Sequence, residues 1–230
     1  MDMIETLHEV STATITSQLI KQGGMRTRAV RGVRPIDPAR FRFAGPAVTV
    51  RYAPMREDLD GLASIGHPDN PMTKAIETMP AGSVLVVQAG TMQGGALGDV
   101  LIARLVARGV AGVVSDGAMR DIAAAAGLGL PVFCAAYTPN PSAAELIAVE
   151  TGGVIGCGGV LVYPGDIVVG DGDGVAVIPR HMAEKVAEAG LEQERMEAWI
   201  RKRVEAGEPI AGLYPPGEAT LAAWRAHKAG

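Results

Sequence analysis

Residues 83–134 read SVLVVQAGTMQGGALGDVLIARLVARGVAGVVSDGAMRDIAAAAGLGLPVFC, and this stretch decides the fold class. It alternates continuous apolar runs, typical of buried strands, with segments of helical periodicity or alanine-rich composition. Strands are expected at 83–88, 111–115 and 130–134, and helices at 97–108 and 121–127. A strand–helix–strand–helix–strand order needs crossover connections, so the strands should pair in parallel and be covered by helices. The sequence therefore predicts an α/β fold with a partly parallel sheet.

Weaker signals extend this core in both directions. Residues 43–52 (FAGPAVTVRY) alternate β-branched and small residues, which predicts one more strand. Residues 153–178 contain short apolar runs joined by Gly, Pro and Asp, which predicts antiparallel hairpins. Residues 4–22 have near-helical apolar spacing and predict one amphipathic helix, with Ser11 as a candidate break point.

The end of the chain has a different composition. Residues 182–206 are rich in helix-forming and charged residues, with a narrow apolar stripe. The stripe consists of Val186, Met196, Ile200 and Val204. A stripe this narrow fits a helix that lies on another subunit. We therefore expect a single α/β domain over 1–180, including an Arg-rich linker at 26–42, followed by a C-terminal helical arm and tail over 181–230.

Composition excludes several classes of protein. The chain has 230 residues, of which 48% are hydrophobic and 20% charged, so it can bury a large core and is not disordered. Its apolar runs are interrupted well before the roughly 18 residues of a membrane span. The first residues, MDMIE, carry acids where a secretory signal carries basic residues. Cys134 and Cys157 lie in apolar surroundings without a CxxC pattern. We expect a reduced, cytoplasmic protein with no membrane partner.

The charge is unevenly distributed. The net charge of -4 argues against general nucleic-acid binding, but residues 26–56 contain eight arginines and one acid, Asp37. The arginines are Arg26, Arg28, Arg31, Arg34, Arg40, Arg42, Arg51 and Arg56. This basic block predicts an acidic partner, for which acids of a neighbouring subunit, an anionic substrate or RNA are the alternatives.

Two turns of the predicted sheet carry the candidate chemistry. The Gly-rich segment 90–98 leads from a strand into a helix that begins near Asp99, a geometry that binds anions through free backbone amides. Consecutive strand-to-helix turns emerge at the same edge of a parallel sheet, so Asp99 should face Arg120 and Asp121. An arginine offers a fixed charged fork to a carboxylate or enolate, and an aspartate offers hard oxygens to a divalent cation. A helix cap for Asp121 and a structural ion pair for Arg120 remain equally open.

Other site types lack their required residues. The four histidines are isolated, so a His-ligated zinc site is not predicted. Residues 171–174 (DGDG) lack the further acids of an EF-hand loop and predict a tight hairpin. None of the five lysines lies on a predicted core strand, where burial would activate a Schiff-base lysine. Carbonyl chemistry in this chain would therefore need a metal.

The motif formed by Asp99, twenty intervening residues and Arg120-Asp121 resembles the signature of the RraA-like family. The likeness continues through the flanking segments AGPAVTV, LPVF and GGVLVYPGDIVVGDGDGVAVIP, and so covers most of the chain. That family contains divalent-metal aldolases acting on 4-hydroxy-4-methyl-2-oxoglutarate and 4-carboxy-4-hydroxy-2-oxoadipate, together with the regulator of ribonuclease E activity. The resemblance implies a swivelling β/β/α-type layered sandwich, assembled as a homotrimer or homohexamer with active sites between subunits.

The resemblance also implies roles for individual residues. Asp121 would bind Mg²⁺ or Mn²⁺, and Arg120 would hold the oxygen that becomes the enolate. Gly98 and the amides of Val100 and Leu101 would receive the substrate carboxylate.

Two further acids complete this implied site. Asp99 would orient a water on the metal, and an acid from the neighbouring chain should approach it, with Glu197 the first choice and Glu194 the second. The chain departs from many relatives at 122–126 (IAAAA), where they carry another acid.

Two functions of different classes follow from these residues. The first is a divalent-metal-dependent lyase that cleaves 4-hydroxy-2-oxo acids to release pyruvate and also decarboxylates oxaloacetate. The alternative is a non-catalytic regulator that binds a ribonuclease or RNA through the basic block. The intact set of Asp99, Arg120 and Asp121 favours the lyase, because a binding module has no need of polar groups facing an anion cradle. A phosphohistidine carrier lacks a histidine at a suitable turn.

Overall fold

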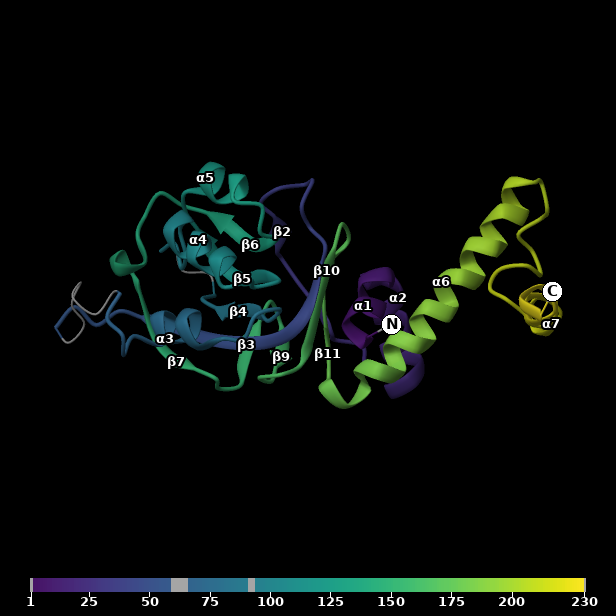
Figure 1. Cartoon of the computed structure of the whole chain (residues 1–230), viewed down its shortest axis with the longest axis horizontal. Coiled ribbons are helices and arrows are strands. Elements are labelled where there is room, and N and C mark those ends of the chain that lie inside the picture. The colour runs from purple at the N-terminus through teal and green to yellow at the C-terminus, as the bar shows by residue number, and fades with distance from the viewer. Residues whose placement is uncertain (1, 59–65, 91–93, 230) are drawn as a thin grey trace.

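The centre of the molecule is a mixed sheet (Figure 1). The computed structural model describes residues 2–58, 66–90 and 94–229. Four neighbouring strands pair in parallel: β3 (Phe43–Pro54), β4 (Val84–Gln88), β5 (Gly112–Met119) and β6 (Val132–Tyr137). Antiparallel strands extend this sheet: β1 (Ala29–Val30), β2 (Arg34–Pro35), β7 (Leu146–Thr151), β10 (Ile167–Asp171) and β11 (Gly174–Ile178). The order is β1-β11-β10-β3-β4-β5-β6-β2, with β7 also paired to β3. The predicted partly parallel sheet is confirmed.

Different layers cover the two faces of the parallel strands. Helices α3 (Pro71–Thr78), α4 (Asp99–Ala107) and α5 (Ile122–Gly127) pack on one face, where side chains such as Ile76, Ile102 and Leu105 are buried. A separate hairpin, β8 (Ile155–Cys157) and β9 (Val160–Val162), packs on the other face against Phe43 and Phe133. The layers are thus hairpin, sheet and helices, which is the predicted β/β/α arrangement.

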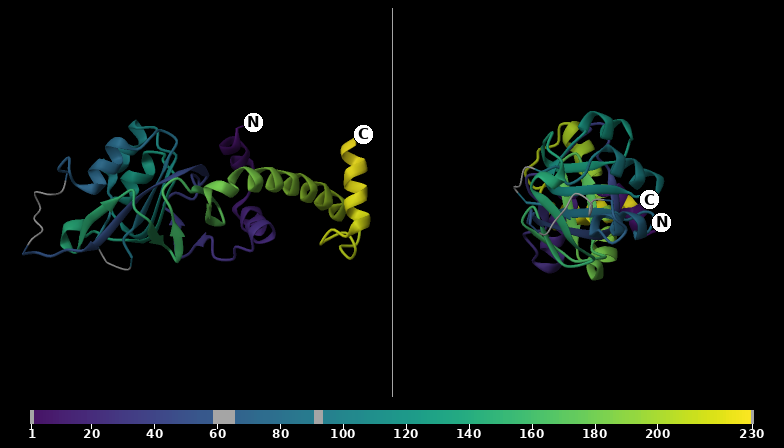
Figure 2. Two further views of the ribbon diagram at one scale, coloured as in Figure 1. Left: turned by 90° about the horizontal axis from the view of Figure 1, so that it is seen from below. Right: turned by 90° about the vertical axis from the view of Figure 1, so that its left-hand side faces the viewer.

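A third core joins the two ends of the chain. Helices α1 (Met3–Glu9) and α2 (Thr12–Gly23) pack with the first turns of α6 (Ala183–Glu205) against β10 and β11. Beyond these contacts α6 continues away from the sheet as a rod, and α7 (Glu218–Ala229) folds back beside its far end (Figures 1 and 2). Trp199 on α6 lies 5.7 Å from Trp224 on α7 between ring centroids. The described residues include no helix that is both long and apolar enough to cross a bilayer.

Three local expectations differ from the structure. The helix predicted over 4–22 is two helices, and the candidate break at Ser11 is confirmed, because Ser11 is the N-cap of α2 and its side chain accepts a hydrogen bond from the amide of Thr14. The segment 26–42 is not only a linker, since it supplies the short strands β1 and β2. The strand predicted over 111–115 runs on to Met119, because β5 resumes pairing with β6 after an irregularity between Ser115 and Ala118.

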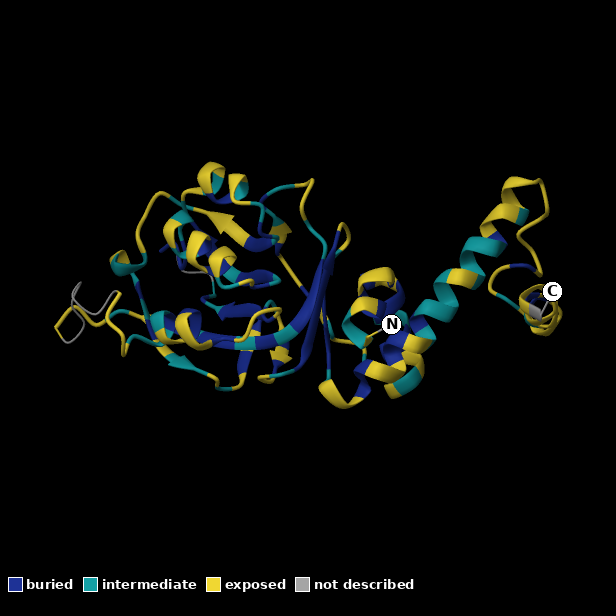
Figure 3. Ribbon diagram, in the orientation of Figure 1, coloured by how far each residue is buried: buried dark blue, intermediate teal, exposed yellow. Residues whose placement is uncertain are grey.

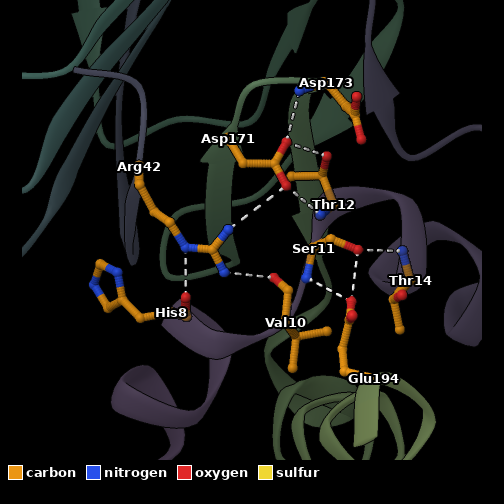
Figure 4. A network of polar contacts seen from close by, with 9 residues as sticks. All are labelled: His8, Val10, Ser11, Thr12, Thr14, Arg42, Asp171, Asp173 and Glu194. Carbon is orange, nitrogen blue, oxygen red and sulfur yellow. Dashed lines mark hydrogen bonds and ion pairs between the residues drawn. The ribbon is translucent and has the colours of Figure 1, made fainter. Parts of the chain in front are cut away.

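The DGDG segment forms the predicted hairpin, between β10 and β11. Asp171 is buried there and accepts hydrogen bonds from the amide and hydroxyl of Thr12 at 2.7 and 2.6 Å, and from the amide of Asp173 (Figure 4). Arg42 lies 3.8 Å from the same carboxylate and donates to the carbonyl oxygens of His8 and Val10. This network fixes the start of α2 to the sheet.

The basic block finds partners that the composition did not indicate. Five of its eight arginines pair with carboxylates of the same chain, and three of these acids lie roughly 100 to 140 positions away in sequence. The pairs are Arg28–Asp166, Arg40–Asp37, Arg42–Asp171, Arg51–Glu150 and Arg56–Asp58. Much of the positive charge in 26–56 therefore orients the chain's own elements.

Candidate active site

The predicted turns meet in one cleft at the carboxyl ends of β4 and β5. The cleft has a volume of about 290 Å³, and its walls come from the Gly-rich loop, the start of α4, the turn after β5 and the segment after β6. The described lining residues are Gly95, Ala96, Leu97, Gly98, Asp99, Val100, Leu101, Arg120, Asp121, Pro141 and Ser142. The structure thus brings Asp99, Arg120 and Asp121 together, as the parallel topology predicts.

The loop before α4 lies directly on the turn after β5. Backbone hydrogen bonds join them, from the amide of Arg120 to the oxygen of Leu97 at 3.0 Å and from the amide of Ala96 to the oxygen of Ala118 at 2.9 Å. A Cβ atom on Gly98 would lie 2.6 Å from Oδ2 of Asp121, closer than real Cβ contacts come. Glycine at this position therefore allows the Asp121 carboxylate to occupy its place beside the helix start.

Arg120 and Asp121 form an ion pair within the cleft. Nε of Arg120 lies 2.9 Å from Oδ2 of Asp121, and both side chains are a little over one-third exposed, at 38% and 37%. Asp121 has φ 55° and ψ 37°, and among the described residues other than glycine it alone has a positive φ. Such backbone strain is concentrated at functional sites. Asp121 occupies the N-cap position of α5, but its side chain makes no capping hydrogen bond and instead pairs with Arg120.

The start of α4 presents backbone donors to the cleft. The first amides of a helix have no acceptor within the helix, and its dipole favours an anion at this end. Oδ1 of Asp99 accepts a hydrogen bond from the amide of Val100 at 2.8 Å. Asp99 therefore occupies a donor that the resemblance assigns to a substrate carboxylate. The side chain of Val100 is 75% exposed, and that of Leu101 is partly buried against the core.

The donor set of the cleft fits a weakly held divalent cation. The described residues contain no group of three or more His, Cys, Asp or Glu side chains that could hold a metal. Mg²⁺ is commonly bound by one or two carboxylates, with substrate oxygens and waters as the other ligands. Asp121 supplies one accessible carboxylate, and Asp99 lines the same cleft. These residues are compatible with Mg²⁺ or Mn²⁺ held jointly with a substrate.

The two acids expected from the arm lie elsewhere in the single chain. Both are on α6, which extends on the side of the sheet away from α4 and α5 (Figure 1). Glu194 accepts hydrogen bonds from the amide and hydroxyl of Ser11 at 3.0 and 2.7 Å (Figure 4). Burial alone would raise the pKa of Glu194, but hydrogen bonds from Ser11 and Thr14, together with the charge of Arg42, outweigh it and lower the pKa. Glu197 accepts from Gln193 and borders a groove with Ile200 and Val204.

Two residues that the sequence did not single out hold the cleft loop. Asp116 accepts hydrogen bonds from the amides of Ala89, Gly90 and Gly158 at 2.8, 2.9 and 3.1 Å, which fixes the start of the loop. The position of Asp116 in the predicted turn at 115–121 could have identified it as a residue that binds loop amides. The hydroxyl of Tyr52 donates to the oxygen of Ala96 at 3.0 Å, and burial raises the pKa of this phenol. Nothing in the sequence around Tyr52 indicated this contact.

Two known proteins are similar to this chain over most of its length. A protein of Halalkalibacterium halodurans with the provisional name 4-hydroxy-4-methyl-2-oxoglutarate aldolase is 32% identical over 84% of each chain. The crystal structure of RraAS2 from Streptomyces coelicolor, described as an unusual member of the RNase ES inhibitor RraA family, matches with a TM-score of 0.77 and 33% identity, covering 86% of this chain and 95% of that one.

The fold is also shared with more distant chains. An uncharacterised Pseudomonas syringae protein has a TM-score of 0.78 at 23% identity, covering 92% of this chain and 96% of that one. Residues 9–177 match the model of the RraA-like family, described as Aldolase/RraA. This match spans most of the chain and includes every residue of the cleft, and we conclude that the chain belongs to the RraA-like family.

Proposed function

We propose that this protein is a divalent-metal-dependent lyase that cleaves 4-hydroxy-2-oxo acids and releases pyruvate. The observation that carries the proposal is the contact between Gly98 and Asp121, with Arg120 beside it, at the start of a helix that lines an open cleft. A carboxylate, a permanent positive charge and backbone donors thus lie in one cleft, which supports a site for a metal-bound 2-oxo acid. The 32% identity to the Halalkalibacterium protein supports the same reaction class.

The reaction is a retro-aldol cleavage. The proton on the C4 hydroxyl is removed, C4 becomes a carbonyl, and the C3–C4 bond breaks. Its electron pair moves into the C2–C3 bond and onto the C2 oxygen, giving an enolate that takes a proton at C3 to become pyruvate. Loss of CO₂ from oxaloacetate produces the same enolate, so we propose oxaloacetate decarboxylation as a second activity of this site.

Each cleft residue has a distinct task in this proposal. Asp121 and the 2-oxo acid would hold Mg²⁺ or Mn²⁺, which supplies Lewis-acid stabilisation of the developing negative charge when bound. Arg120 stabilises the same C2 oxygen with a guanidinium that remains charged at all working pH values. Gly98 leaves room for the Asp121 carboxylate, and the amides of Val100 and Leu101 bind the substrate carboxylate.

Asp99 has to change partner in this scheme. Its carboxylate accepts a hydrogen bond from the amide of Val100, so a substrate carboxylate bound to that amide would displace it. Asp99 then positions the water that accepts the proton of the C4 hydroxyl and delivers a proton to C3.

We further propose that the working form is a homo-oligomer, a trimer or a hexamer. In one chain the cleft is open to water, with Arg120 and Asp121 each more than one-third exposed. Exclusion of water strengthens the electrostatic interactions on which such a reaction depends. A second copy would cover the cleft and bring Glu197 from its arm as an additional acid.

The second candidate function is regulation of a ribonuclease without catalysis. It is favoured by the 33% identity to RraAS2, whose family is described as inhibitors of RNase ES. The intrachain pairing of five arginines in the basic block is less favourable to an RNA-binding face.

A pyruvate-release assay tests the proposed function. Purified protein is incubated with a panel of 4-hydroxy-2-oxo acids and with oxaloacetate, in Mg²⁺, in Mn²⁺ and in EDTA, and pyruvate is followed with a coupling enzyme. We expect release that EDTA abolishes and either metal restores, and Asp121→Ala should lose it while remaining folded. Full activity in EDTA would overturn the metal assignment. Absence of pyruvate from every substrate would favour the regulator.

A further inference from the structure

A second cavity adjoins the candidate active site. It lies between α3, β3, β7 and the start of α4, and it shares the lining residues Ala96, Leu101 and Ser142 with the cleft. Its volume is about 170 Å³. An engineered apolar cavity of about 150 Å³ binds benzene, so this pocket has room for a ring or a short alkyl chain.

The pocket is apolar in character. Its walls include Met55, Met72, Leu146 and Ile147, and none of the described residues that line it carries a charge. The described lining residues therefore offer no cation for a second carboxylate.

Two polar groups at the pocket wall already have partners within the chain. The hydroxyl of Tyr52 donates to the oxygen of Ala96, and Oδ1 of Asn70 accepts from the amides of Met72 and Thr73 at the start of α3. The hydroxyls of Thr73 and Ser142 also line the pocket, and both are neutral. The wall therefore suits a carbon chain better than an anion, for which it offers neutral groups and no opposite charge.

We propose that this pocket receives the C4 substituent of the substrate, and that the enzyme prefers 4-hydroxy-2-oxo acids with an alkyl or aryl group at C4 over those with a second carboxylate. The proposal rests on the proposed function, because it places the 2-oxo acid end of the substrate against Asp121 and Arg120. Ala96, Leu101 and Ser142 line both cavities, so a substituent that points from the cleft toward α3 would be directed at the pocket.

The expected selectivity follows from transfer energies. Each CH₂ group moved from water into an apolar site changes affinity by about fourfold. A carboxylate without a partner in such a site is strongly disfavoured. We expect kcat/KM to rise along the series 4-hydroxy-2-oxopentanoate, 4-hydroxy-2-oxohexanoate and 4-hydroxy-2-oxoheptanoate, and to be at least about tenfold lower for 4-hydroxy-2-oxoglutarate.

The experiment combines turnover with a binding readout. Pyruvate release in Mg²⁺ is measured for the four substrates, and thermal shifts are measured with the unreactive analogues 2-oxopentanoate, 2-oxohexanoate and 2-oxoglutarate. Met55 is partly buried at the end of β3, and Lys has a similar length, so Met55→Lys places a cation at the pocket wall. Met55→Leu is the matched apolar control.

The outcomes separate the two levels of the proposal. Rising activity with chain length in the wild type and in Met55→Leu, together with a relative gain for 4-hydroxy-2-oxoglutarate in Met55→Lys, supports the pocket. Preference of the wild type for 4-hydroxy-2-oxoglutarate, or equal rates along the alkyl series, overturns the pocket assignment and leaves the lyase intact. If no substrate releases pyruvate, the proposed function fails, and thermal shifts that do not grow with chain length then overturn the pocket as well.

Discussion

Replacement of Gly98 by alanine tests whether the position of the Asp121 carboxylate controls activity. The backbone at Gly98 has φ -127° and ψ -175°, which any residue can adopt, so the substitution introduces no backbone strain. The new methyl group would lie 2.6 Å from Oδ2 of Asp121, whereas ordinary contacts begin at 3.4 Å. The carboxylate must therefore move by about 0.8 Å, the difference between these two distances.

The expected effects on activity and stability are very different. A misplacement of about 1 Å in a reacting group can lower a rate about 10²-fold, so we expect kcat/KM for pyruvate release to fall by that order, or about 2.7 kcal/mol. The free energy of unfolding should change by less than about 1 kcal/mol. Loss of the Arg120–Asp121 pair, which is more than one-third exposed, costs little, and replacement of a glycine stabilises by restricting the unfolded chain.

The assay is pyruvate release beside urea unfolding, with Gly156→Ala as the control. Gly156 has no atom within 4 Å of the position a Cβ would take, so its substitution should leave kcat/KM unchanged and change the free energy of unfolding only by the small gain expected of any compatible Gly→Ala replacement. The double variant Gly98→Ala with Asp121→Ala should be no slower than Asp121→Ala alone, because both changes act on one carboxylate. Normal kcat/KM in Gly98→Ala would refute the assignment of Asp121, and a strictly additive double variant would show that Gly98 acts through another group.

Three further substitutions examine other parts of the molecule. Arg120→Lys should lower kcat about 10²-fold with little effect on stability, because an ammonium cannot reproduce the guanidinium fork; a near-normal kcat would leave Arg120 with a structural role only. Because the folded-state pKa of Glu194 is lowered, this carboxylate stabilises the protein above the usual Glu range and loses that contribution as the pH falls through its folded pKa. Glu194→Gln should therefore flatten the fall in melting temperature below about pH 4.5, and an unchanged acid limb would contradict this reasoning. Glu197→Gln should lower kcat at least about tenfold without changing the oligomer seen by light scattering, whereas the exposed Glu188→Gln on the same helix should not; equal rates for both would place Glu197 outside the active site.

Much of the fold could be predicted because its signals are local. The apolar runs that became β4, β5 and β6 and the amphipathic segment that became α4 are contiguous, and parallel connection places their following turns at one edge. The cleft follows from that topology. The extension of β5 to Met119 could not be predicted in the same way, since Ser115-Asp116-Gly117 has the composition of a turn and only pairing with β6 makes the segment a strand.

The basic block shows where local signals mislead. Its arginines form a conspicuous run, but their acids lie far away, with Arg28 paired to Asp166 and Arg51 paired to Glu150. Composition shows how much charge a segment carries but not which residues it contacts, so the sequence predicted an acidic partner outside the basic block. The positive φ of Asp121 could not be predicted for a related reason. In a sequence it is glycine that normally indicates a left-handed conformation, whereas at Asp121 the turn between β5 and α5 imposes it.

The C-terminal arm leaves apolar side chains exposed that no other described part of the same chain covers. The inner turns of α6 are covered by α1 and α2, with Val186 fully buried, but Val204, Ile210 and Tyr214 near its far end are 37%, 60% and 46% exposed (Figure 3). Exposed apolar groups beside Glu197 suit a contact with another copy, since apolar burial would supply the affinity and the acid would be carried to a defined place. The cleft, in turn, has an accessible Asp121 but no group of three or more potential metal ligands among the described residues. Both features support the proposal that the arm of one copy completes the active site of another, and they explain why neither periodicity nor charge pattern could specify the position of Glu197.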